Sequence, residues 1–514
     1  MKSTHRLNLF GASLVGMVAI SGLATPALAQ ESHFDKLANL PFGQGRPTND
    51  TAQTLRDELL FQRATETYLW AMPLINTLGM QVGSEKTFGE GYNVLPIWKQ
   101  RLDAKTLVTT PNSDVLYAMS YVDLGKDGPL VMEAPPMLQG ILLDYWQRPI
   151  PVDGGKFFGD VGLAGPDRGK GGKFLLLPPG YKGTVPNGYF VYRSGTFDVF
   201  IFLRGFFEDP KNLTPAVANL EQTKIYPLND AAAAKPMKFP NASGVPVNML
   251  PISDGSAFDQ LKLLVDREGD NLAGPDWLGM LAAIGIVKSQ PFTPDAHTRE
   301  ILDQAARTAY KMSRVIGFEQ VVDGRSYRIY PDRRWANPFA DGTPTKPSGP
   351  LNLAWINTAG RYLALDSRIN FFTNYYSTSP GMLSITPGKG ARYLMAFSDS
   401  EGAPLFGASN YHLGLPPNIP AAIFWSVTLY DAENSSGLAN GQPLPSLGSR
   451  DKPTQNADGS TDLYFGPKAP KGKAGNWLAT VPGKGYFAIL RLYGPTEAAF
   501  DKSWKPGDIE SVKR

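Results

Sequence analysis

Residues 109–124 place an amide and a carboxylate directly before an alternating apolar run. Asn112 and Asp114 belong to a polar turn, and the residues of one face then follow at a period of two: Val115, Tyr117, Met119 and Tyr121. This alternation predicts a strand. The turn should therefore lie at the rim of a sheet, where a partly desolvated carboxylate can serve as an acid, a base or a cation ligand. The alternative is a turn whose Asn and Asp bond only their own backbone.

A second carboxylate and a mid-strand arginine have equally unusual neighbours. Asp144 ends an apolar run and is followed by Tyr145 and Trp146, so it is either hydrogen-bonded structurally or a desolvated acid, base or ligand group. Arg204 interrupts another apolar run, and a mid-strand arginine usually pairs with a carboxylate. Asp114 and Asp144 are the expected partners.

One histidine and one tryptophan in the C-terminal half complete the candidate residues. The chain has four histidines. Among the histidines after residue 29, only His412 lies where a strand could aim it at a cleft. An ordinary core or rim imidazole is the alternative. Trp425 could form a binding platform, although such aromatic residues more often belong to the core.

Several types of chemistry are excluded by composition. The chain has no cysteine, which removes thiolate nucleophiles and cysteine-ligated metals. Beyond the leader we find no G-x-S-x-G elbow, no H-E-x-x-H pair and no complete phosphate-binding loop. The cofactor is left open, with one divalent cation held by carboxylates as an option.

The overall composition indicates an exported globular protein. Its 514 residues, 42% of them hydrophobic, suffice for two or three domains. Lys and Arg number 50 against 47 Asp and Glu, without basic runs, so nucleic acid is not an expected partner. Residues 1–29 combine Lys2 and Arg6, an apolar run and Ala27-Leu28-Ala29, which predicts a cleaved signal peptide. We expect a periplasmic or extracellular protein with no transmembrane segment after the signal is removed.

The pattern along the chain predicts an α+β protein that is mainly β. After the signal peptide (1–29), residues 30–90 form an N-terminal arm and helices. Residues 91–230 read as short strands and tight turns, which predicts an antiparallel β-sandwich. Residues 231–335 are a linker and a helical segment. Residues 336–514 begin with a Pro- and Gly-rich stretch and continue as a second β-sandwich or jelly roll.

Several segments together resemble two known families. The resemblance to domain-of-unknown-function family 1254 lies in Thr110 to Tyr117, residues 174–180 and Arg204. The resemblance to family 1214, its usual C-terminal companion, lies in residues 424–431, 456–460, 476–478 and 490–495. The resemblance implies two β-sandwich domains with a helical insertion and says little about chemistry. Val115 departs from the threonine that family 1254 commonly has after the Asp of this motif.

The first functional hypothesis is a hydrolase or related lyase that acts on a small or oligomeric substrate between the two domains. Asp114 and Asp144 would be the acid and base, or the ligands of a divalent ion. Arg204 would stabilise negative charge, Tyr117 would orient the substrate, and His412 could contribute from the second domain.

The second hypothesis is a noncatalytic envelope protein that binds a small molecule or a glycan. Asn112, Tyr145, Trp146 and Trp425 are the candidate ligand contacts, and a homo-oligomer is a further option. The two hypotheses differ in what they require of Asp114 and Asp144, because only the enzyme needs these carboxylates in one cleft.

Overall fold

The computed structural model of the chain describes most of its residues: 31–319, 321–322, 325–337, 355–357, 360–382 and 387–512. The chain divides into two compact units, which meet in sequence between Glu58 and Leu59. The predicted signal peptide and most of the predicted Pro- and Gly-rich boundary lie outside the described residues. Both therefore stay predictions.

The first unit contains a short capped helix and a small hairpin. Helix α1 (His33–Ala38) begins after Ser32, whose hydroxyl accepts the Asp35 N–H while the Asp35 carboxylate accepts the Ser32 N–H. Strands β1 (Phe42–Gly43) and β2 (Arg46–Pro47) pair antiparallel. Helix α2 (Asn49–Trp70) follows, and α3 (Met72–Phe88) carries Pro73 in its first turn. Pro73 thus lies where α2 ends and α3 begins, because a proline is tolerated in the first turn of a helix but not in its interior.

Two sheets form the first β region (residues 97–227). The first is antiparallel, in the order β3 (Ile97–Trp98), β5 (Leu116–Asp123), β11 (Asp198–Gly205), β7 (Gln139–Asp144), β8 (Asp160–Val161). The second has the order β10 (Phe190–Arg193), β9 (Gly172–Leu177), β6 (Leu130–Ala134), β12 (Lys224–Pro227), with β9 and β10 parallel. Apolar side chains of both sheets share one buried core.

Strand β5 is buried on both faces, and its alternation decides which core each side chain enters. Leu116, Ala118 and Val122 belong to the core shared by the two sheets. Tyr117 and Tyr121 belong to a second core on the opposite face of the sheet. The predicted strand and its period are confirmed, and the aromatic face points toward the pocket described below.

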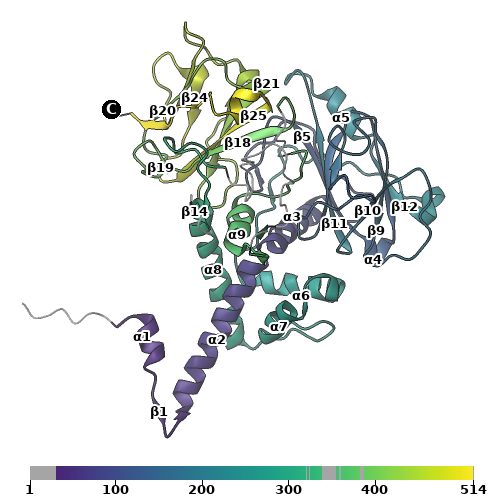
Figure 1. Cartoon of the computed structure of the whole chain (residues 1–514), viewed down its shortest axis with the longest axis vertical. Coiled ribbons are helices and arrows are strands. Elements are labelled where there is room, and N and C mark those ends of the chain that lie inside the picture. The colour runs from purple at the N-terminus through teal and green to yellow at the C-terminus, as the bar shows by residue number, and fades with distance from the viewer. Residues whose placement is uncertain are drawn as a thin grey trace, which may run out of the picture. The chain divides into compact units, whose positions relative to one another are not determined.

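The second β region (residues 391–511) also contains two sheets. One is antiparallel, in the order β18 (Ala391–Ala396), β25 (Gly485–Pro495), β21 (Ala421–Asp431), β22 (Ser446–Gly448), and β19 (Leu405–Phe406) also pairs with β25. The other has the order β24 (Trp477–Ala479), β23 (Thr461–Gly466), β20 (Tyr411–Leu415), β26 (Ile509–Ser511). These sheets share a core of their own. Figure 1 shows the blue strands of the first β region beside the yellow-green strands of the second.

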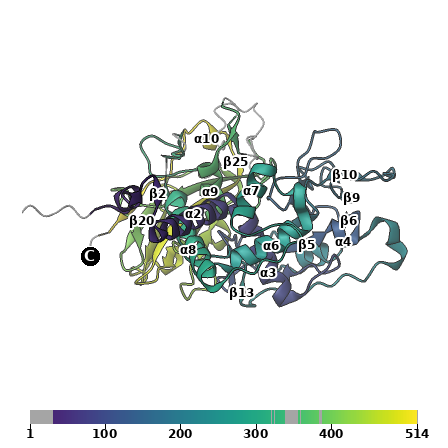
Figure 2. The same cartoon turned by 90° about the horizontal axis from the view of Figure 1, so that it is seen from below.

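Four longer helices lie in sequence between the two β regions. They are α6 (Ser256–Glu268), α7 (Pro275–Ala283), α8 (Ala296–Phe318) and α9 (Leu365–Asn374). Helix α9 packs against α3 and α8, and Figure 2 shows these helices grouped together. The smaller elements are α4 (Leu124–Asp127), α5 (Thr214–Leu220), α10 (Glu497–Phe500), β4 (Thr106–Leu107), β13 (Val247–Asn248), β14 (Val321–Val322), β15 (Arg325–Ser326), β16 (Ile356–Asn357) and β17 (Tyr362–Leu363).

The fold is a mixed α+β arrangement, as the sequence predicted, but helices contribute more than expected. About 29% of the residues are helical and 26% are in strands, so "mainly β" overstates the strands. The long helices α2, α3 and α8 account for the difference. No helix in the described part of the chain combines the length and apolar character needed to span a bilayer.

Candidate functional site

The turn before β5 joins the two β regions. Its backbone and Asn112 side chain bond residues of the second β region and its hairpin loop: Thr110 N–H to Ser435 O (2.6 Å), Tyr430 OH to Pro111 O (2.6 Å), Arg491 Nη2 to Thr110 O (3.2 Å) and Asn112 Nδ2 to Tyr493 OH. Thr110 has a positive φ of 41°, a conformation that a non-glycine residue adopts only when its surroundings hold it there. The turn that the sequence singled out is therefore a fixed part of the junction.

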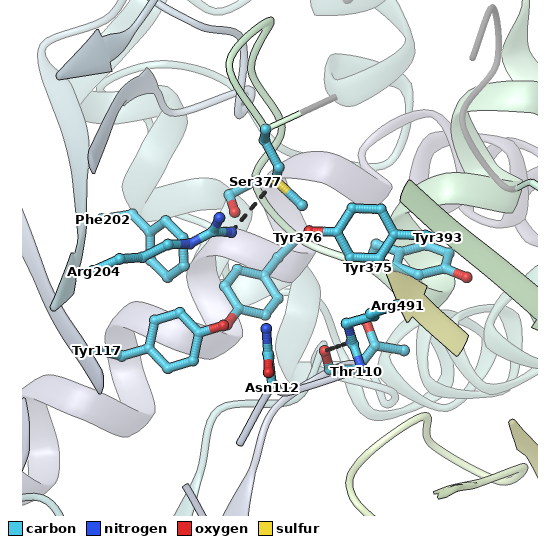
Figure 3. Close-up of a pocket in the computed structure, with 11 residues that line it drawn as sticks. Thr110, Asn112, Tyr117, Phe202, Arg204, Tyr375, Tyr376, Ser377, Tyr393 and Arg491 are labelled. Carbon is cyan, nitrogen blue, oxygen red and sulfur yellow. Dashed lines mark hydrogen bonds between the residues drawn. The ribbon is translucent and has the colours of Figure 1, made fainter. Parts of the chain in front are cut away.

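A pocket lies at this junction and is drawn in Figure 3. Its empty volume is about 380 Å³ with open solvent included, and the centre of a water molecule can occupy about 30 Å³ of it. Its lining comes from β5, β11, β18, β25, the turn and the segment after α9: Thr110, Asn112, Tyr117, Phe202, Arg204, Tyr375, Tyr376, Ser377, Met382, Tyr393 and Arg491. The lining contains two arginines and no Asp, Glu or His.

Arg204 reaches this pocket from β11, where its Cα partner on β5 is Tyr117. It is only 8% exposed. Its Nη2 lies 3.5 Å from Met382 Sδ, a weak acceptor, and its Nε has no hydrogen-bond partner. Among the described residues, no carboxylate oxygen lies within 4.0 Å of its guanidinium. The predicted pairing with Asp114 or Asp144 is therefore wrong.

Arg491 enters from β25 and is 3% exposed. It donates to Tyr430 OH (2.6 Å), to Thr428 Oγ1 (3.3 Å) and to the Thr110 carbonyl, all of them neutral acceptors. Its Nε has no partner. Within the described part of the chain it too has no carboxylate within 4.0 Å. Two buried cations thus line one pocket, and among the described residues neither has a carboxylate oxygen within 4.0 Å.

Aromatic side chains form the wall between the arginines. The rings of Tyr117 and Phe202 stack at 5.2 Å, and Tyr376 meets Phe202 edge-on at 5.6 Å. Burial raises the pKa of Tyr117 well above its usual value, although the nearby charges of Arg204 and Arg491 partly oppose this. Its phenol therefore stays protonated at neutral pH, and it can donate a hydrogen bond but is a poor base.

Comparison with known proteins finds a family model that matches each of the two β regions. Residues 92–227 match the family described as protein of unknown function DUF1254, and residues 390–497 match the one described as protein of unknown function DUF1214. The two matches lie in that order along the chain. The resemblance seen in the sequence is confirmed, and we refer to these parts as the DUF1254 and DUF1214 regions.

Two solved structures are similar to this chain. The crystal structure of the VPA0106 protein from Vibrio parahaemolyticus is 18% identical with a TM-score of 0.50, covering 88% of this chain and all of that one. A putative uncharacterized protein from Burkholderia cenocepacia is 13% identical with a TM-score of 0.40, covering 90% of this chain and 97% of that one. The first similarity shows a shared fold. No curated protein matches the chain.

Asp114 of the DUF1254 region is a buried structural group rather than part of the pocket lining. Its Oδ2 accepts the Ser426 hydroxyl at 2.5 Å, and its Oδ1 lies 3.4 Å from Arg101 Nη2. Its own N–H donates to Asn112 Oδ1 at 2.8 Å, closing the local turn that the sequence left open as an alternative. Arg450 donates to its carbonyl at 2.8 Å. The carboxylate thus fastens the DUF1254 region to the DUF1214 region.

Asp114 and Asp144 lie at opposite ends of the central strand pairing. Leu116, two residues after Asp114, pairs with Gly205 at one end of β11. Asp144 pairs with Val199 near the other end of β11. The six-residue separation along β11 corresponds to roughly 20 Å. The expected acid and base pair, or shared cation site, is therefore not formed by these two residues.

Asp144 and Tyr145 have structural partners of their own. Asp144 accepts from Arg148 through both the Nε (2.7 Å) and the backbone N–H (2.9 Å), and burial still raises its pKa. The hydroxyl of Tyr145 bonds Gln81 Oε1. Neither residue lines the pocket, so the structure gives them no part in ligand binding there.

The remaining predicted residues are also outside the pocket lining. Trp146 donates its indole N–H to Leu272 O at 2.9 Å, and Trp425 is buried in the DUF1214 core. His412 Nε2 lies 2.8 Å from Asp462 Oδ1, and the two residues belong to the paired strands β20 and β23 of one sheet. Of the predicted site residues, the structure therefore brings together Asn112, Tyr117 and Arg204.

No metal site is formed by the part of the chain that the structure describes. Within residues 31–512, leaving out the undescribed gaps, no group of three or more His, Cys, Asp or Glu side chains could hold a metal ion. The option of a carboxylate-bound divalent cation gains no support from these residues.

Asp160 is a pocket-supporting residue that sequence reasoning missed. It accepts the Ser379 hydroxyl at 2.6 Å and the Gly381 N–H at 3.0 Å, which holds the segment that brings Met382 to the pocket. Burial raises its pKa to about 6, and the charge of Arg204 opposes this rise. Asp160 is thus a titratable group within the electrostatic range of the pocket.

Proposed function

We propose that this protein binds a small organic anion in the pocket between the DUF1254 and DUF1214 regions, through Arg204 and Arg491. The observation that carries this proposal is that both arginines are buried in one pocket without a carboxylate partner. A buried charge is costly unless it is paired. A carboxylate on the ligand would supply that pairing, because the guanidinium fork matches its geometry.

Of the two hypotheses drawn from the sequence, this proposal follows the binding protein and not the hydrolase or lyase. The pocket lining has no Asp, Glu or His to act as a general base, and Tyr117 stays protonated. The small space favours one compact molecule over an oligomeric substrate or a glycan. We retain export by the predicted signal peptide as part of the proposal, which would place the ligand in the periplasm or outside the cell.

We also infer that each β region is a β-sandwich. Support comes from the apolar residues of both sheets that share one core in the DUF1254 region, and likewise in the DUF1214 region. In this arrangement the pocket lies against the outer face of one sheet from each sandwich, and the junction turn closes it.

The proposal is tested by comparing an anion with a neutral molecule of the same shape. We expect benzoate to raise the melting temperature in a concentration-dependent manner, because a ligand of the native state stabilises it by mass action. Benzamide, which has a similar size but no charge, should produce no shift. An equal shift with both compounds, or none with a panel of benzoate, acetate and fumarate, would contradict the proposal.

Anion affinity should depend on pH through Asp160. The raised pKa of about 6 means that Asp160 is ionised at pH 7.5 and mostly protonated at pH 5. Protonation removes a negative charge that opposes the attraction of Arg204 for an anion. We therefore expect benzoate affinity to rise by a few-fold, on the order of 1 kcal/mol or less, between pH 7.5 and pH 5.

Titration calorimetry at these two pH values measures the effect. In Asp160→Asn the pH dependence should disappear. Asp153→Asn is the matched control, because Asp153 is an exposed carboxylate of the same region that pairs with Arg193. A wild-type affinity that falls toward pH 5 would show that the sign of the predicted coupling is wrong.

A further inference from the structure

Arg204 and Arg491 line different parts of the pocket. Arg204 extends from β11 and Arg491 from β25, and no acceptor is shared between them. Figure 3 shows them entering from opposite sides, with Tyr376 drawn between them. The charges of both act on Tyr376 and on Tyr117, so both cations are close enough to influence one enclosed space.

Each guanidinium has N–H groups left over for a ligand. Arg204 uses one Nη2 contact to a sulfur atom, and its Nε is without a partner. Arg491 uses Nη1 and Nη2 for neutral acceptors, and its Nε is likewise unpartnered. An arginine with free N–H groups on one edge can take a carboxylate through paired hydrogen bonds. The pocket thus has the donors for two separate anionic groups.

The surface between the two cations suits a flat apolar body. Tyr117, Phe202 and Tyr376 present packed rings there, and Tyr393 completes the aromatic lining. Aromatic side chains favour stacked or edge-on contact with another flat ring. No acidic side chain of the lining would repel a second negative charge on the ligand.

We propose that the ligand is a compact dicarboxylate with a flat unsaturated or aromatic body. Arg204 binds one carboxylate and Arg491 binds the other. This inference rests on the proposed anion-binding function and specifies its ligand class. A single phosphate group would require both guanidinia to converge on one set of oxygens, whereas these two side chains enter from opposite sides and share no acceptor.

The test compares diacids with their own monomethyl esters by titration calorimetry on the wild-type protein. The probes are terephthalate, isophthalate and fumarate, each beside its monomethyl ester, with benzoate and inorganic phosphate as further ligands. At least one diacid should bind about 10-fold or more tightly than its ester, since the ester loses one charge-assisted contact. In Arg204→Met, that diacid and its ester should bind with equal affinity.

The outcomes separate this inference from the function on which it rests. If each ester binds as tightly as its diacid, or phosphate binds more tightly than every diacid, the dicarboxylate inference is overturned while anion binding stands. If none of these anions binds, both are overturned. The wild-type comparison needs no variant, so a folding defect in an arginine variant cannot obscure the result.

Discussion

Benzoate binding should fall by about 100-fold in Arg204→Met, while the melting temperature stays the same or rises. Removing one partner of a buried charge pair typically costs a complex 2 to 5 kcal/mol, which corresponds to roughly 30-fold or more in affinity. In the unliganded protein, methionine fills similar space without an unpaired buried charge, so the free energy of unfolding should stay the same or increase. Titration calorimetry and thermal unfolding measure the two effects on the same samples.

The control for Arg204→Met is Arg193→Met in the same region. Arg193 is exposed and pairs with Asp153 at 2.8 Å, so its loss should change neither affinity nor stability by a measurable amount. If Arg204→Met lowered the melting temperature sharply and kept its affinity for benzoate, Arg204 would be a structural residue and the proposed function would lose its main support.

Asp114→Ala should destabilise the protein by about 1 to 3 kcal/mol, the usual cost of leaving a buried polar group without its hydrogen-bond partner. Asp114 is 2% exposed, and its removal leaves the Ser426 hydroxyl without its acceptor. Arg101 loses a contact of 3.4 Å but keeps Asp451 at 3.0 Å and the Ser113 carbonyl at 2.7 Å. The contacts weakened most should be those between the DUF1254 and DUF1214 regions, because Ser426 belongs to the DUF1214 region. Thermal unfolding and urea unfolding give the magnitude.

Asp153→Ala serves as the comparison for Asp114→Ala, because it removes an exposed carboxylate that also pairs with an arginine. Its effect should be within about 0.5 kcal/mol. A stable Asp114→Ala protein that had lost ligand binding would instead return Asp114 to a direct functional role, as the sequence first suggested.

The local features of the site could be predicted from sequence because they depend on nearby residues. The period of two before and within β5 identified the strand and placed Tyr117 on one face. An arginine within an apolar strand marked Arg204 as unusual. Arg491 carries the same signal between Leu490 and Leu492, and it could have been identified by the same reasoning.

The features that failed depend on contacts between distant parts of the chain. The sequence predicts Asp114 and Asp144 as a pair, but the register of β5 and β7 against β11 places them near opposite ends of that strand. The burial of Asp160 depends on Ser379, more than two hundred residues away. The segment after α9 that supplies Tyr376 has no strand or helix pattern that would place it at the pocket.

The most direct test of the account is the position of a bound anion in the crystal. Crystals grown with 4-iodobenzoate allow the iodine to be located by its anomalous scattering and the carboxylate by the adjoining density. We predict a carboxylate bonded to Arg204, with the ring against Tyr117 and Tyr376. A fully occupied ligand bound elsewhere, with the pocket holding only solvent, would contradict the central claim.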